Sequence, residues 1–194
     1  MAFEDASLER ALRAETKGGV TLYGGVGELT VIGNGWMAVI PEGELRERLR
    51  GTLGALVEML GYIPGVETVR ILRQKGGYTV KPEMPETVAA EICVYAEETE
   101  TEEIRMTGLR LGGDALAQKR SGEIVGIPPR GPGLCVRRYC VTPGGIVRQE
   151  DEDTGERLYR RGYRPREDTD TETALRRWKH LEMIDWCGWD APEE

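Results

Sequence analysis

The chain has 194 residues, of which 39% are hydrophobic and 31% charged, and its formal net charge is −8. These values suit a folded globular protein with one sizeable core. No apolar run approaches the roughly 20 residues that a membrane-spanning helix needs, and the N-terminal segment lacks the apolar stretch of a secretory signal. The four cysteines are too sparse for a disulfide scaffold. We therefore expect an unanchored, cytoplasmic protein.

In chain order, the first predicted elements are a short helix and a β-hairpin. Residues 7–15 carry leucine and alanine at helical spacing, which predicts a short amphipathic helix. Between residues 20 and 40, two β-type runs flank the Gly-Asn-Gly segment 33–35. Asn-Gly between apolar runs indicates a tight hairpin, because both residues tolerate positive φ.

The next element is a long amphipathic helix over about 42–61. Its apolar stripe falls at spacings of three and four. The stripe consists of Leu45, Leu49, Leu53, Leu56, Leu60 and Ile63. Glycine costs about 1 kcal/mol in a helix interior, so Gly51 and Gly54, beside Ala55, predict a close neighbour at the backbone. Gly61 is placed to end the helix in a left-handed cap.

The rest of the chain is richer in β-type sequence. Residues 67–84 predict a second hairpin that turns at 75–77, and residues 87–96 fit a helix or a strand. Further strands are predicted over 104–111, 123–127, 134–142, 146–150 and 157–163. A C-terminal helix is predicted over about 171–186, with Thr169 and Glu172 as its capping box.

The mixture of helices and strands lacks a regular βαβ alternation, and this favours an α+β fold with antiparallel hairpins. We expect a single domain over 1–194. The acidic segment 97–103 is the place where a subdivision would fall, as a linker or an exposed turn.

Common catalytic motifs are missing from the sequence. His180 is the single histidine, and neither Ser7 nor Ser121 lies in a G-x-S-x-G elbow. The glycines of 24–27 are not followed by the Lys-Ser/Thr of a phosphate-binding loop, so a hairpin turn or bulge is predicted there. The acidic segment 151–156 does not place its glycine as an EF-hand loop does. We predict neither a catalytic residue nor a cofactor.

The cysteines invite a zinc interpretation. Cys135 and Cys140, together with His180 and Cys187, would make four ligands. Two residues five apart on one strand point to opposite faces, however, so the predicted strand 134–142 disfavours a shared metal site. We interpret these cysteines, and Cys93, as free thiols.

Charge is arranged in blocks along the chain. One acidic block includes Glu97, Glu98, Glu100, Glu102 and Glu103. It predicts either a solvated linker or a carboxylate surface that imitates a phosphate backbone. Later segments interleave arginine with tyrosine, at Arg137, Arg138, Tyr159, Arg160, Arg161 and Tyr163. Arginine binds phosphate or carboxylate, and tyrosine stacks on bases or anchors protein interfaces. Trp189, beyond the last helix, is a further interface candidate.

The pattern favours a non-enzymatic binding protein that acts through a protein–protein interface. In composition and style it resembles phage or mobile-element accessory proteins, including anti-defence inhibitors, so we expect an inhibitor or adaptor of nucleic-acid-handling machinery. The alternative is a nucleic-acid-binding protein that uses the Arg/Tyr hairpins. A second alternative is an enzyme that uses acidic residues and a divalent metal. A solvated sheet face, with arginines paired to acids of the same chain, is the plainest explanation of the basic blocks.

Overall fold

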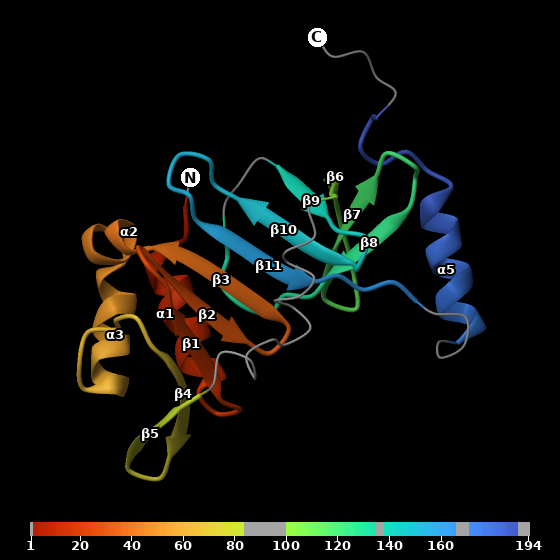
Figure 1. Cartoon of the computed structure of the whole chain (residues 1–194). Helices are drawn as coiled ribbons and strands as arrows, with labels where there is room; N and C mark the ends of the chain where they lie inside the picture. The colour runs from red at the N-terminus through yellow and green to blue at the C-terminus, as the bar shows by residue number, and fades with distance from the viewer. Residues whose placement is uncertain (1, 84–99, 135–137, 166–170, 190–194) are drawn as a thin grey trace.

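The computed structural model describes residues 2–83, 100–134, 138–165 and 171–189 (Figure 1). One antiparallel sheet of eleven strands runs through the described part of the chain, with helices at both of its ends. The α+β class predicted from the sequence is confirmed. The segment 87–96, for which the sequence left helix and strand open, lies outside the described residues.

The first half of the chain forms one end of the sheet, in the order β5-β4-β1-β2-β3. The bounds are β1 Val20–Gly24, β2 Glu28–Gly33, β3 Trp36–Pro41, β4 Thr68–Gln74 and β5 Gly77–Pro82. Both predicted hairpins are confirmed, as β2–β3 and as β4–β5. The glycine-rich loop 25–27 is the turn between β1 and β2, as expected. In the turn at 34–35, Gly35 adopts a φ of +80°.

Three helices belong to this half: α1 Asp5–Glu15, α2 Glu42–Glu47 and α3 Arg50–Leu60. The expectation of one helix over 42–61 is therefore wrong. The chain leaves helical geometry at Leu49, whose ψ is +50°. Asp5 of α1 then accepts hydrogen bonds from the backbone N–H groups of Gly51 (2.7 Å) and Thr52 (2.8 Å), so that α1 caps the start of α3. Gly61 ends α3 in the left-handed conformation, as predicted.

These helices cover one face of the sheet and build the larger core. It joins Leu8 and Leu12 of α1 and Leu56 of α3 to apolar residues of β1 to β4. A Cβ at Gly51 would lie 2.9 Å from the Asp5 carboxylate, which explains one of the two helix glycines. At Gly54 the predicted close neighbour is absent, because a Cβ there would meet nothing within 4 Å.

The second half of the chain continues the sheet in the order β11-β10-β9-β6-β7-β8. The bounds are β6 Glu102–Leu111, β7 Asp114–Lys119, β8 Ile124–Ile127, β9 Tyr139–Val141, β10 Ile146–Glu150 and β11 Arg157–Arg161. β11 pairs with β3 and so joins the two halves. Gly126 of β8 exchanges two backbone hydrogen bonds with Tyr163, just beyond β11, so this half curls back on itself. The curl encloses a second core, composed of Ile104, Ala117, Val125, Ile127, Val141 and Val147.

Two expectations for this half need correction. The acidic segment is not only a linker, since Glu102 and Glu103 begin β6 and pair with β9. The strand expected over 134–142 is described as a strand only over Tyr139–Val141. The sequence also gave no prediction for β7, which lies between β6 and β8.

The last helix, α5 Glu172–Glu182, packs on the outside of β8 at the other end of the molecule (Figure 1). Its N-cap is Thr171, whose side chain accepts a hydrogen bond from the backbone N–H of Ala174, and the predicted box at Thr169 is not used. Trp178 is buried against Leu116 and Ile124. None of the described helices is long and apolar enough to cross a membrane.

Candidate functional site

The structure divides the arginines and tyrosines that the sequence placed on one exposed face. β11 lies inside the sheet, between β3 and β10, so both of its edges are hydrogen-bonded to neighbouring strands, and Leu158 and Tyr159 are buried. Tyr159 is only 4% exposed and packs in a cluster with Met37 and Ile146. The guanidinium of Arg148 lies 6.0 Å from the centre of its ring. Tyr159 is thus a core residue, and the expectation that it lies on the binding surface is wrong.

Arg160 points to the opposite face and is largely buried as well. Its guanidinium donates to the carbonyl of Arg130 (3.0 Å), to Oε1 of Gln149 (2.9 Å) and to the carbonyl of Pro132. Burial lowers the pKa of Arg160 from its usual value. These contacts hold the loop at 130–132 against the sheet, so Arg160 acts in the fold rather than on a free surface.

The remaining predicted residues are scattered. Arg138 is exposed and lies 3.7 Å from Glu152, whereas Arg137 lies outside the described residues. Arg161 is exposed. Tyr163 is 41% exposed and meets Trp178 edge-on, with ring centres 5.8 Å apart.

Trp189 and the acidic block do not join them. Trp189 is only 9% exposed, and the guanidinium of Arg105 lies 4.1 Å from the centre of its ring. Glu100, Glu102 and Glu103 are exposed. Glu103 pairs with Arg105 (3.7 Å) and Glu102 with Lys119 (3.5 Å). Glu97 and Glu98 lie outside the described residues.

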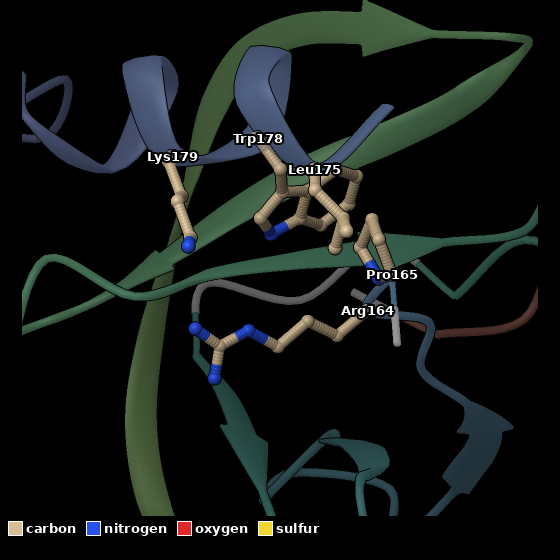
Figure 2. A pocket seen from close by; sticks show the side chains of 5 residues that line it. All are labelled: Arg164, Pro165, Leu175, Trp178 and Lys179. Atoms are coloured by element: carbon tan, nitrogen blue, oxygen red, sulfur yellow. The ribbon is translucent and has the colours of Figure 1, made fainter. Parts of the chain in front are cut away.

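A shallow pocket of about 270 Å³ lies between α5 and the segment after β11 (Figure 2). It is lined by Arg164, Pro165, Leu175, Trp178 and Lys179. The guanidinium of Arg164 donates to acids of the same chain, Glu123 (2.8 Å) and Glu182 (3.1 Å). Of the two cations that line the pocket, Arg164 is therefore paired with acids of the same chain, which weakens the pocket as an anion site.

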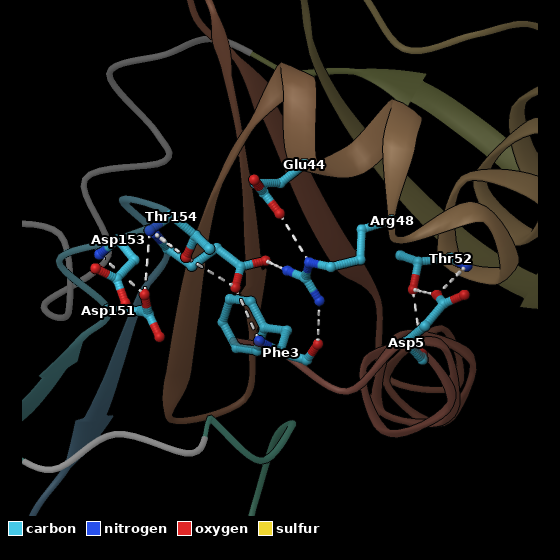
Figure 3. Close-up of polar contacts among 9 residues, drawn as sticks. Phe3, Asp5, Glu44, Arg48, Thr52, Asp151, Asp153 and Thr154 are labelled. Carbon is cyan, nitrogen blue, oxygen red and sulfur yellow. Dashed lines mark hydrogen bonds and ion pairs between the residues drawn. The ribbon is translucent and has the colours of Figure 1, made fainter. Parts of the chain in front are cut away.

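A cluster of polar side chains joins the two halves of the chain (Figure 3). Glu156 is fully buried; it forms an ion pair with Arg48 and accepts a hydrogen bond from the backbone N–H of Phe3 (2.8 Å). Arg48 also donates to Glu44 (2.7 Å) and to the carbonyl of Phe3 (2.6 Å). Burial raises the pKa of Glu156, although these partners oppose the shift. The polar groups here are paired with one another, so the cluster stabilises the fold.

In the first half of the chain, the most exposed apolar side chains lie on two neighbouring loops and near the end of β1. Val26 is 95% exposed in the β1–β2 loop, and Val66 is 77% exposed in the loop from α3 to β4. Ile63 (53%), Tyr62 (43%) and Tyr23 (42%) accompany them. We call these five residues the apolar tip. Ile63, which the sequence placed on the helix stripe, belongs here instead.

The two loops of the apolar tip are fixed to each other by the backbone. The N–H of Gly24 donates to the carbonyl of Glu67 at 2.7 Å. A Cβ at Gly24 would lie 1.8 Å from the carbonyl oxygen of Gly65, so only glycine fits. The N–H of Glu42 donates to the carbonyl of Gly27 at 2.8 Å and fixes the other side of the β1–β2 loop.

Acids border the apolar tip. The hydroxyl of Tyr62 donates to Glu67 at 2.8 Å, and burial together with this carboxylate raises the pKa of Tyr62. Glu28 pairs with Arg157 at 2.7 Å. Among the described residues, the carboxylate of Glu67 has no basic partner. It lies directly beside the apolar tip.

Sequence reasoning missed the apolar tip because Val26 was assigned to a turn, Ile63 to a helix and Tyr23 to a β-type run, while Val66 received no assignment. One signal was present: Val26 between Gly25 and Gly27, and the apolar Tyr62-Ile63 just after Gly61, put bulky apolar side chains in segments with turn chemistry. Turn residues are usually polar or small, so aliphatic residues in these segments are exceptions that indicate an exposed apolar surface.

The described residues contain no group of three or more His, Cys, Asp or Glu side chains placed to hold a metal ion. Cys140 and Cys187 are free thiols, and burial raises the pKa of Cys187. Cys93 and Cys135 lie outside the described residues. No family model, curated protein or solved structure matches the chain.

Proposed function

We propose that this chain is a non-enzymatic cytoplasmic binding protein that docks on another protein through the apolar tip. The observation that carries the proposal is the exposure of Val26 and Val66 on two loops that backbone contacts hold together. The backbone contact between the loops brings these side chains into one region of the surface, and exposed apolar patches mark interaction sites more often than scattered apolar residues do.

The chemistry of the tip describes its partner. An apolar plug with a carboxylate beside it fits an apolar pocket bordered by lysine or arginine. Proteins that handle nucleic acid carry such basic surfaces. The net charge of −8 favours the same encounter. The protein would then act as an inhibitor or adaptor of nucleic-acid-handling machinery, of the kind expected from the sequence.

The test compares affinity capture by the wild-type chain with capture by the double variant Val26→Asp/Val66→Asp. Burial of one aliphatic side chain contributes about 1.5–3 kcal/mol, so the loss of two should weaken binding of the captured protein at least ~100-fold. Met183→Asp is the matched control, since Met183 is 83% exposed at the C-cap of α5, away from the tip. Circular dichroism confirms that all variants fold.

Three outcomes would refute the proposal. The first is equal capture by the wild type and the double variant, and the second is an equal loss of capture in the Met183→Asp control. The third is direct binding of DNA or RNA at low salt with an affinity that falls steeply as salt rises, which would assign the protein to the nucleic-acid binders instead.

A further inference from the structure

The sheet has one open edge within the described residues, and it is β5. The opposite edge strand, β8, is closed by Tyr163 through two backbone hydrogen bonds of 2.7 and 2.8 Å. β5 pairs on one side only, with β4. Figure 1 shows the β4–β5 hairpin projecting away from the body of the molecule. An edge strand of this kind is a template for a further strand.

The register of the hairpin identifies the backbone groups that point outward. Gly77 faces Gln74 across a two-residue turn, and the N–H of Glu83 donates to the carbonyl of Thr68 at 2.9 Å. Groups alternate along an antiparallel strand, so the odd-numbered residues from 77 to 83 bond to β4. The N–H and C=O groups of Tyr78 and Val80 therefore face away from the sheet. Pro82, at the end of β5, has no N–H to offer.

We propose that β5 pairs in antiparallel fashion with β5 of a second copy of this chain, about a twofold axis at Thr79. In this register Tyr78 faces Val80 of the second copy and each exchanges both backbone hydrogen bonds, so every outward N–H of 78–80 finds an acceptor. Thr79 faces Thr79, and cross-strand threonine pairs are favourable. An isologous contact of this kind closes after two copies.

Side-chain chemistry supports the same register. Tyr78 and Val80 pack against the larger core, so pairing extends an apolar face that α3 already covers. Gly77 to Val80 carry no charge that would keep a second strand away. The register also brings Lys75 beside Glu83 of the second copy, while Lys81 faces Gly77. No like charges are directly opposed along the paired strands.

The test is a cysteine cross-link at the proposed axis. Facing residues of a non-hydrogen-bonded pair have Cβ atoms about 4.5–5.5 Å apart, within reach of a disulfide after a small adjustment. Thr79→Cys should therefore form a covalent dimer under mild oxidation. Lys81→Cys lies on the same strand and face, but its equivalent in the second copy would be roughly 13 Å along the strands. It should cross-link at least tenfold more slowly, and the wild type, oxidised in parallel, reports the native thiols.

Sedimentation equilibrium supplies the second measurement. The wild type should show a reversible dimer, and Val80→Pro, which removes one outward N–H at an edge position that tolerates proline, should raise the dissociation constant at least tenfold. Equal cross-linking of the two cysteine variants would overturn the proposal, as would a wild type that stays monomeric. If the wild type is monomeric and Val80→Pro weakens capture of the partner protein, the edge binds that partner, and this result would also overturn the proposal. The apolar tip is untouched by these variants, so its test stands or fails separately.

Discussion

Asp5→Ala should weaken the fold by removing the cap that α1 provides for α3. The carboxylate accepts hydrogen bonds from the N–H groups of Gly51 (2.7 Å) and Thr52 (2.8 Å) and from the Thr52 hydroxyl (2.8 Å). Loss of an N-terminal cap costs about 0.5–2 kcal/mol, and the lost hydrogen bond of the Thr52 hydroxyl, which keeps only the backbone carbonyl of residue 5 as an acceptor (3.3 Å), adds about 0.5–1 kcal/mol. We expect a loss of about 1–3 kcal/mol, or roughly 2–12 °C in Tm for a chain of this size.

The pH dependence of this loss gives a second readout. Burial alone would raise the pKa of Asp5, but the hydrogen bonds from Thr52 and Gly51 outweigh it and hold the pKa below its ordinary value. A lowered folded pKa contributes stability above the unfolded pKa of about 3.9, and this stability is lost as pH falls through the folded pKa. The difference between wild type and Asp5→Ala should therefore be constant from pH 7 to about 5 and shrink below about 4.

Urea unfolding followed by circular dichroism measures both quantities. Glu47→Ala is the control, since Glu47 is exposed on α2 and should change stability by less than about 0.5 kcal/mol. Asp5→Asn keeps one acceptor oxygen and should fall between the two. If Asp5→Ala matched the Glu47→Ala control at pH 7, or if its loss were the same at pH 3, the capping role would be refuted.

Two further predictions concern the core and the apolar tip. Arg48→Met leaves the Glu156 carboxylate buried without its cation and should cost about 3–5 kcal/mol at pH 7. Burial raises the pKa of Glu156 and Arg48 opposes that shift, so removing Arg48 should raise this pKa further, and protonation then relieves the unpaired charge as pH falls. Urea unfolding should show the cost shrinking towards pH 5, and a pH-independent cost would contradict this. Gly24→Ala, whose Cβ would lie 1.8 Å from the carbonyl oxygen of Gly65, should cost about 1–3 kcal/mol. Gly54→Ala, with open space at its Cβ, should gain about 0.5–1 kcal/mol, and equal Tm values for the two would exclude the close approach.

The hairpins were predictable because their signals are local. The turns at 34–35 and 75–76 join runs rich in β-branched and aromatic residues, and the register follows from the length of the turn. The break between α2 and α3 was not predictable, because Leu49 continues the apolar stripe of both helices. A side chain from α1, 46 residues away from Gly51, sets where α3 begins. A contact that distant leaves no trace in the local pattern.

The functional surface was less predictable than the fold. The sequence does not distinguish an arginine or tyrosine on an exposed face of a strand from one on a covered face. The cluster with Met37 and Ile146 buries Tyr159, and the loop at 130–132 engages Arg160. Charge blocks along the chain also carry little information about surfaces, because the sheet places strands from both halves side by side. Residue type indicated that Arg138 and Arg161 are exposed, but it did not indicate that they lie apart from each other.

The apolar tip differs from an ordinary exposed loop because it is rigid before any partner arrives. The N–H groups of Gly24, Gly25 and Glu42 donate to carbonyls at 2.7 to 2.9 Å, so the backbone around Val26 is fixed on three sides. Ordering a loop on binding normally subtracts from the affinity, and here that cost has already been met in folding. A fully exposed valine on a fixed loop gains nothing for the free chain, since it stays in water when the protein folds. It contributes only when another surface covers it, and this is why the tip, rather than the basic strands, is the surface on which the proposed binding should depend.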